Sequence, residues 1–421
     1  MSSILIKSAT IIYPGHELHN TKRDLLIKNG VVEKIGTRIV SKVAKVISSK
    51  KLHLSPGWLD IGCTGGEPGH EHRETLESLS RVAAAGGYTG LALFPNTEPV
   101  IDNRSAVQYI KNQTKAHLVD YYPIAAVSKS CEGQELTEMI DLHQHGAIAF
   151  SDGHKPISSN GLMMRALDYS KGFGGLIIHH PHDPSLTNGH QVNEGEVSLV
   201  LGMKGTPAIA EVLTLDRDLQ LNNYSKARLL IHNVSTAESV DKLQEDNWKN
   251  SFASVSYLHL CKTDQDLYGY DTNYKMIPTL GSAADKAALI TAVNKRTIQV
   301  ISSNHVPLEE DLKKREYFHA EPGTLGLQTT FSALNTYTPE INLGRLVTCL
   351  SINPRKILGL PPISLDKGHK AEFTLFDPTV DWTLDTKTNA SKSKNSPFWD
   401  KSLTGCVIAV VNGKKSHFNK Y

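Results

Sequence analysis

The 421-residue sequence lacks the features that would place it in a membrane, on a nucleic acid or in an oxidising compartment. Its 45 basic and 43 acidic residues give a formal net charge of +2, without the clustered basic charge that binds nucleic acids or membrane surfaces. The apolar runs are too short to span a bilayer, and the N-terminus does not read as a signal peptide. Five scattered cysteines without a CxxC pair favour a reducing cytoplasm.

Residues 60–69, DIGCTGGEPG, lack histidine, lysine and arginine altogether. They follow the apolar run LHLSPGWL, and this pattern is typical of a buried strand that opens into an active-site loop. The residue types that usually carry the chemistry of such a loop are missing. The sequence by itself does not explain why a loop of this kind would lack them.

What the sequence does contain is an alternation of short apolar runs and longer helical patterns. The segment ETLESLSRVAAAGG (74–87), for example, repeats apolar residues every three to four positions and ends in two glycines. Buried parallel strands read as continuous apolar runs, and eight strand–helix units close a barrel. We therefore predict an α/β fold, a (β/α)₈ TIM-type barrel, with strands within 54–62, 88–97, 119–128, 146–153, 175–183, 228–235, 252–260 and 297–305.

Both ends of the chain differ from this pattern. Residues 1–54 and 366–421 read as short strands with Asn-Gly turn signals, and neither end is long enough to bury a good core alone. We predict that the two ends form one composite β-sandwich domain, and that residues 55–365 form the barrel.

Active residues of such barrels lie at the carboxyl ends of the strands. The predicted strand ends are polar here, and they comprise residues 60–67, 95–97, 151–153, 179–183, 232–236, 259 and 304–305. We expect these residues to meet at one mouth of the barrel.

Several of these segments resemble dihydroorotase, in the branch of the amidohydrolase superfamily that includes the hydantoinases. The motifs SPGWLDIGCTGGEPG, AAAGGYTGLALFPNTEPVID, GAIAFSDG, QVNEG, NVSTAESV and NPRKILGL carry the resemblance, from about residue 5 to 415. It implies a barrel with a composite β-domain that interconverts dihydroorotate and carbamoyl aspartate. That chemistry needs a zinc-held hydroxide, an aspartate that moves the proton, and groups that bind the substrate carboxylate.

Compared position by position, the resemblance implies that most metal ligands are lost. The two strand-end histidines of the family fall on Gly62 and Thr64, and a later histidine ligand falls on Asn233. Asp152 and His180 remain as vestigial ligands. His232 precedes Asn233, and strand alternation predicts that it points to the opposite face.

The same comparison covers the catalytic and substrate-binding positions. The catalytic aspartate of the family falls on Asn304, whose amide is not a useful base. Asn96 is retained, whereas the family's substrate-binding arginine, asparagine and histidine fall on Gly66, Ile277 and Leu308.

Three functions stay open at this point. The first is a cytoplasmic pseudoenzyme of pyrimidine biosynthesis without a cofactor, which forms a homodimer or supports aspartate transcarbamoylase, as inactive members of the family do. The second is an active cyclic-amide hydrolase with zinc in a rebuilt site around His180, His182 and Asp152. The third is a ligand-binding role for a roomier, more apolar pocket in which anions bind weakly.

Overall fold

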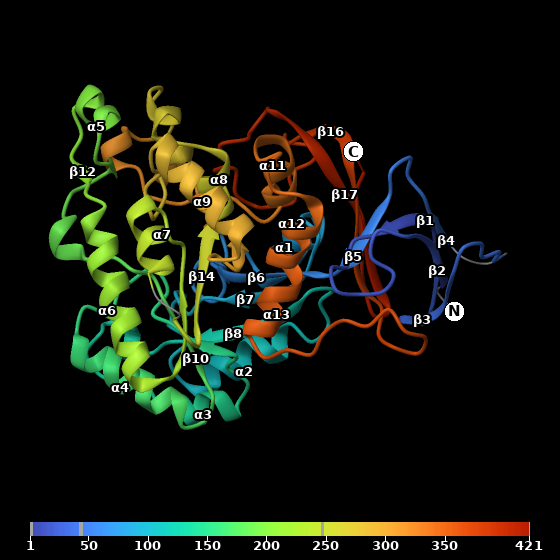
Figure 1. The fold of residues 1–421 in the computed structure, drawn as a ribbon, viewed down its shortest axis with the longest axis horizontal. Helices are drawn as coiled ribbons and strands as arrows, with labels where there is room; N and C mark the ends of the chain where they lie inside the picture. Colours follow the sequence, from blue (N-terminus) through green and yellow to red (C-terminus); the bar gives the residue numbers. More distant parts are fainter. Residues whose placement is uncertain (1–2, 42–44, 246–247, 421) are drawn as a thin grey trace.

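The computed structural model describes residues 3–41, 45–245 and 248–420, and it contains the predicted barrel (Figure 1). Eight parallel strands pair in chain order, and the last lies against the first, so that the barrel is nearly closed. The strands are β6 (Trp58–Cys63), β7 (Tyr88–Leu93), β8 (Asp120–Ala125), β9 (Ala149–Phe150), β10 (Leu176–His179), β13 (Arg228–Ile231), β14 (Ser251–Ser256) and β15 (Val300–Ser302). Each falls within one of the eight predicted segments apart from Cys63 and Ser251, so the fold class is confirmed.

Alternate residues of these strands enter two different cores. Leu59, Ile178 and Leu230 belong to a cluster inside the barrel. Their neighbours Trp58, Ile177 and Leu229 pack outside the barrel, in the cluster that includes the helices. Because both faces are buried, the strands have no polar face, and this explains their continuous apolar runs.

Helices surround the barrel on its outside (Figure 1). The first begins after Thr75, whose hydroxyl accepts from the Ser78 N–H, and it ends at Gly86, before the left-handed Gly87 (φ 97°). The helices are α1 (Leu76–Ala85), α2 (Arg104–Gln113), α3 (Met139–Gln144), α4 (Asn160–Lys171), α5 (Glu196–Leu201), α6 (Ile209–Ser225), α7 (Ala237–Gln244), α8 (Tyr257–Cys261), α9 (Ala283–Lys295), α10 (Glu310–Lys313), α11 (Thr330–Tyr337), α12 (Leu343–Val347) and α13 (Asn353–Ile357).

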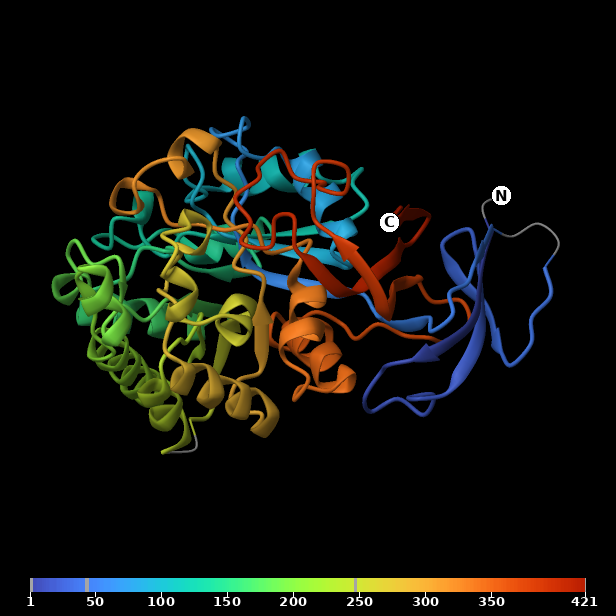
Figure 2. The ribbon, with the colours of Figure 1, turned by 90° about the horizontal axis from the view of Figure 1, so that it is seen from above.

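A mixed sheet beside the barrel joins the two ends of the chain (Figure 2). Strand β5 (His53–Pro56) pairs antiparallel with β16 (Glu372–Thr383), which places Leu54 opposite Leu375. The sheet order is β18-β17-β16-β5-β1-β2-β3, with β4 on β1; the remaining bounds are β1 (Ser3–Ile11), β2 (Lys22–Lys28), β3 (Val31–Gly36), β4 (Lys45–Ile47), β17 (Ser402–Asn412) and β18 (Lys415–Phe418). The described strands form one sheet rather than the two separate sheets of a sandwich. The domain boundaries stay predictions.

One predicted strand is shorter than expected. The run at 252–260 was predicted as a single strand, but β14 ends at Ser256 and Tyr257–Cys261 is helix α8. His259 therefore lies on a helix and not at a strand end. In the described part of the chain, no helix is both long enough and apolar enough to cross a membrane.

Candidate functional site

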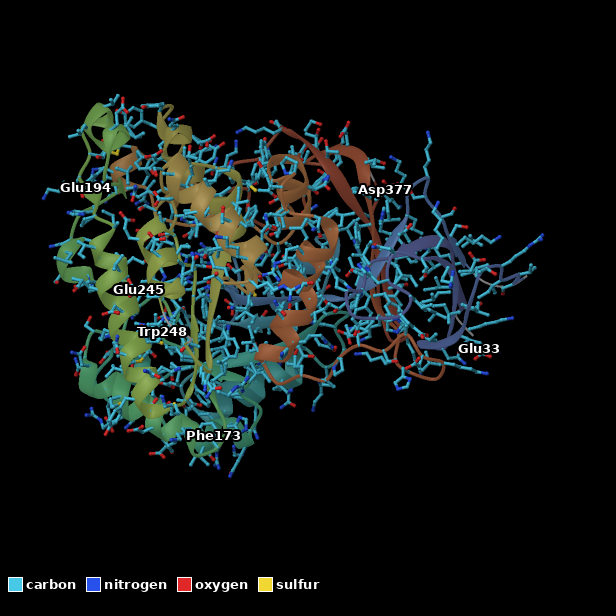
Figure 3. All side chains as sticks on the ribbon, in the orientation of Figure 1. Glu33, Phe173, Glu194, Glu245, Trp248 and Asp377 are labelled. Carbon is cyan, nitrogen blue, oxygen red and sulfur yellow. The ribbon has the colours of Figure 1, made fainter. Side chains whose placement is uncertain are left out.

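The carboxyl ends of the barrel strands surround a pocket of about 210 Å³. Its wall includes His154 after β9, His182 after β10, Ser235 after β13 and Ile277 after α8. Two short strands outside the barrel, β11 (Val192–Asn193) and β12 (Gly205–Thr206), also contribute residues to this wall. Figure 3 shows Glu194, which follows β11, at the end of the molecule far from Glu33 and Asp377 of the composite sheet.

A larger hollow of about 620 Å³ lies elsewhere. It is lined by Arg296 and Gln299, which follow α9 and precede β15, and by Pro14 of the composite sheet's first loop. These residues lie at the amino end of a barrel strand. The smaller pocket is therefore the one at the carboxyl ends of the barrel strands, where the active residues of such barrels lie.

Gly62 lies in an irregular part of β6 where a side chain has no room. Its φ is 90°, and the register between β6 and β7 shifts between Ile61 and Cys63. A β-carbon added to Gly62 would lie 2.7 Å from both His232 Cε1 and Phe94 Cζ. The space beside Gly62, where the resemblance implies a histidine, is thus filled by two other rings.

His232 points into the barrel, and the predicted opposite orientation is wrong. It lies two residues after Leu230 of the inner core, so strand alternation itself places it inside. Asn233 also reaches an inner residue, because its left-handed backbone (φ 58°) turns the chain after β13: Asn233 Oδ1 accepts from Ser302 Oγ at 2.6 Å. Burial lowers the pKa of His232 to about 3, so its ring is neutral at pH 7.

Thr64 makes a weak polar contact across the mouth. Its hydroxyl lies 3.4 Å from His154 Nε2, and its N–H donates to the His305 carbonyl. His305 in turn accepts the Gly326 N–H on Nδ1, which fixes the following loop. Thr64 is therefore part of the packing of the mouth.

Asp152 accepts hydrogen bonds from the loop that follows β8. Its carboxylate accepts the Val127 and Ser128 N–H groups, each at 2.9 Å, and the Ser128 hydroxyl. Burial raises its pKa in spite of these donors. The sequence left open whether Asp152 is a ligand or a strand-end carboxylate satisfied by backbone donors, and its contacts favour the second interpretation.

His180 and His182 are neighbours with different surroundings. His180 Nδ1 lies 3.3 Å from the His232 carbonyl, and its Nε2 is buried without a partner. His182 Nε2 is 2.7 Å from the Thr187 hydroxyl. The described residues contain no group of three or more histidines, cysteines and acids that could hold a metal ion.

The remaining predicted positions lie around the same mouth. Asn304 has a left-handed backbone (φ 42°), and its amide donates to the Ile277 carbonyl. Ile277 is partly exposed on the pocket wall, whereas Leu308 is buried. Asn96 donates to the Asp152 carbonyl. A β-carbon on Gly66 would lie 2.3 Å from the carbonyl oxygens of His70 and Glu74, so an arginine does not fit there.

Glu211 is a buried acid of the pocket wall that we did not predict. It lies on α6, and its carboxylate accepts from the Ser235 and Thr236 N–H groups and hydroxyls. Burial raises its pKa. Glu211 lies on a helix, whereas the predicted site residues lie at strand ends. The sequence signal that would predict Glu211 is an acidic residue on the side of a helix that faces the interior.

The barrel, the composite sheet and the polar strand ends together define a hydantoinase-like fold. The structure is similar to an L-hydantoinase (dihydropyrimidinase) from Arthrobacter aurescens, with a TM-score of 0.86 and 20% identity over 100% of this chain and 97% of that chain. It is also similar to a D-hydantoinase, with a TM-score of 0.82 and 20% identity over 99% and 95% of the two chains. At these identities the likeness shows the fold alone.

The sequence comparisons narrow the class to a family. Residues 51–239 match the family described as Dihydro-orotase-like. A dihydroorotase from Caldicellulosiruptor saccharolyticus is 38% identical over 420 residues, which cover 98% of this chain and 97% of the relative. One from Syntrophotalea carbinolica is 34% identical over 417 residues, with 98% of both chains covered. The chain therefore belongs to the dihydroorotase family.

Proposed function

We propose that this chain is a dihydroorotase-family pseudoenzyme that neither hydrolyses nor closes the dihydroorotate ring. The observation that carries the proposal is the filled space at Gly62, where the rings of His232 and Phe94 lie within 2.7 Å of an added β-carbon. A lost ligand leaves a gap that water or another ligand can fill. A repacked ligand position leaves no such gap.

The donor atoms at the mouth do not fit a zinc ion. A catalytic zinc needs three protein ligands in fixed geometry, because only a metal-held hydroxide is a strong nucleophile at neutral pH. Of the positions that would hold it, Gly62 has no donor, Thr64 is a hydroxyl and Asn233 is bound to Ser302. The carboxylate of Asp152 is occupied by three donors. The amide of Asn304 cannot accept the proton of the attacking water.

Purified protein is expected to show no turnover of dihydroorotate or carbamoyl aspartate, and less than about 0.1 equivalent of zinc. The measurements are a spectrophotometric assay in both directions and elemental analysis of protein prepared without chelator, both repeated after incubation with added zinc. A catalytically active relative prepared in parallel is the control. Stoichiometric zinc together with turnover would contradict the proposal and support the rebuilt site around His180, His182 and Asp152.

We further propose that the protein acts in the cytoplasm as a structural or regulatory partner of aspartate transcarbamoylase. A candidate contact is the α5 surface, which we define as Leu199, Val200, Tyr268 and Tyr270. Leu199 is 83% exposed and Val200 is 64% exposed, and α5 contacts the short helix that precedes Tyr268. Exposed apolar groups of this kind mark interaction surfaces.

The two proteins are expected to elute together in size-exclusion chromatography at about 10 μM, because a stable interface of standard size gives micromolar or better affinity. The variant Leu199→Lys/Val200→Lys is expected to elute alone, while Lys111→Glu on the distant helix α2 is the control. Independent elution of the unmodified proteins would refute the partnership. A homodimer that the lysine variant dissolves would assign the α5 surface to a second copy.

A further inference from the structure

The larger hollow, of about 620 Å³, lies between the first loop of the composite sheet and the amino end of the barrel. Pro14 and His19 line it from the loop, and Arg296 and Arg345 line it from the barrel. The loop packs closely on α12, because a β-carbon added to Gly344 would lie 3.4 Å from Pro14 Cγ. Small-molecule sites are concave and typically enclose about 300–1,000 Å³, so the hollow has the size of a binding site.

The hollow carries positive charge without a matching acid. Among the described residues that line it, Arg296 and Arg345 are permanently charged, and no aspartate or glutamate is found. Four other arginines in the described part of the chain pair with carboxylates, whereas these two do not. Two guanidinium groups that share a hollow repel each other, and an anion bound between them would replace this repulsion by attraction.

The barrel itself fixes the position of Arg345. Its Nε donates to the Val293 carbonyl at 2.6 Å and its Nη2 donates to the Ile298 carbonyl at 2.8 Å. These two carbonyls lie on either side of Arg296 in the chain. The bonds use two of the five N–H groups of the guanidinium, and three stay available to a ligand. A guanidinium that is already oriented loses little freedom on binding, and its fork of donors matches the oxygens of a phosphate.

Neutral groups add further donors and an apolar surface. His19 Nδ1 accepts a backbone N–H of its own loop at 3.2 Å, so the neutral ring carries its proton on Nε2 as a donor. Asn342 Oδ1 accepts the Arg345 N–H at 2.9 Å, which leaves the amide NH₂ as a donor. Pro14 and Ile352 supply apolar contact on the same wall. The hollow therefore suits an anion that also has an organic part.

We propose that the hollow binds a nucleotide-sized phosphate monoester, with the phosphate on Arg296 and Arg345 and the organic part against Pro14 and Ile352. A bare phosphate would leave most of the 620 Å³ unfilled. The proposal is independent of the chemistry at the barrel mouth, because the hollow lies at the amino end of the barrel strands. Since both the loop and the barrel contribute to the wall, the ligand would stabilise the contact between them.

The test compares ligands that differ by one phosphate group. Isothermal titration calorimetry on the full chain measures AMP and UMP against adenosine, uridine and inorganic phosphate. At least one nucleotide is expected to bind with a Kd below about 1 mM, and at least about tenfold more tightly than its nucleoside and than inorganic phosphate. A Kd above about 1 mM for both nucleotides, or a nucleoside or inorganic phosphate that binds within about tenfold of them, would overturn the proposal.

Two variants locate the site and leave the backbone unstrained. Arg296→Gly removes a guanidinium at the end of α9, where φ is 69° and glycine is the preferred residue. Asn342→Asp keeps the side-chain oxygen that caps α12 and places a carboxylate on the wall of the hollow. Each is expected to weaken nucleotide binding by about tenfold or more, because a hydrogen bond to a charged group is lost or a repulsion is added.

Lys226→Gly is the matched control. Lys226 ends α6 in the same left-handed conformation (φ 61°), is exposed, and lies outside the hollow. Its replacement lowers the net charge by the same amount as Arg296→Gly, and the nucleotide Kd should change by about twofold or less, because salt screens distant exposed charges. If Arg296→Gly or Asn342→Asp binds the nucleotide as tightly as Lys226→Gly does, the site assignment is wrong. Turnover of dihydroorotate would contradict the proposed function alone.

Discussion

The variant Gly62→His, which adds the histidine that the resemblance to the family implies at this position, is expected to lower the free energy of unfolding by about 4 kcal/mol and to produce no activity. A β-carbon at residue 62 would lie 2.7 Å from both His232 and Phe94, which is closer than van der Waals contact. The backbone there has φ 90°, a conformation that side chains other than glycine rarely adopt. Chemical denaturation followed by circular dichroism measures the change.

Three comparison variants test the cause of this loss. Gly62→Ala adds only the β-carbon and should show most of the destabilisation. Gly62→His combined with His232→Ala should lose about 2 kcal/mol less than the sum of the two single changes, because His232 is one of the residues in conflict. Gly269→His adds the same side chain where no atom lies within 4 Å, and it should change stability by about 0.5 kcal/mol or less. If the Gly62→His protein is as stable as the Gly269→His protein, the residues around position 62 can move apart to accommodate a side chain.

The barrel could be predicted because its strands are buried on both faces. Runs such as YTGLAL and LIIH have no solvent side, so each appears in the sequence as a short and mostly apolar block. The same property explains the error at 252–260. Tyr257 and Leu260 of α8 are as buried as Val255 of β14, and an apolar run of this length cannot distinguish a strand from a short buried helix.

Only those properties of the site that follow from residue identity alone could be predicted from the sequence. Glycine at 62 and asparagine at 304 cannot bind zinc or act as a base in any conformation. The orientation of His232 required knowledge of which strand residues face inward, and that of Asn233 required its positive φ. Neither the inward-facing side of the strand nor the positive φ can be inferred from the neighbouring residues. The position of Glu211 depends on how α6 docks beside β13, which is a property of the whole barrel.

The buried histidines at the mouth of the barrel make the stability of the protein depend on pH. His232, His259 and His305 are among those that are at most 2% exposed. Burial lowers their pKa values from 6.5 to about 3, 4 and 3 respectively. In the unfolded chain the same imidazoles bind protons below about pH 6.5. The unfolded state therefore binds more protons than the folded state between about pH 4 and 6.5, and stability must fall as the pH falls through this window.

Acidification from about pH 7 to 4 is expected to remove about 6 kcal/mol of stability through these histidines and Asp60, a large fraction of the total stability of a typical folded protein. Each of the three histidines contributes a loss of about 3 kcal/mol at pH 4, since one unit of pKa shift corresponds to about 1.4 kcal/mol. Asp60 acts in the opposite direction. Burial raises its pKa to about 6, so the folded state binds a proton there between about pH 4 and 6 and regains about 3 kcal/mol. Denaturant titrations across this pH range measure the net change.

Variants that keep the existing hydrogen bonds but cannot titrate isolate the contribution of the histidines. In His259→Gln the amide can still donate to the Thr279 carbonyl, and in His305→Asn the side-chain oxygen can still accept from the Gly326 N–H. Each is expected to reduce the protons taken up on unfolding near pH 5 by about one, which lowers the slope of stability against pH by about 1.4 kcal/mol per pH unit. His369→Phe removes an exposed histidine of the composite-sheet side and should leave the slope unchanged. An unchanged slope in both buried variants would mean that these rings are already protonated in the folded protein at pH 5, and that burial does not keep them neutral.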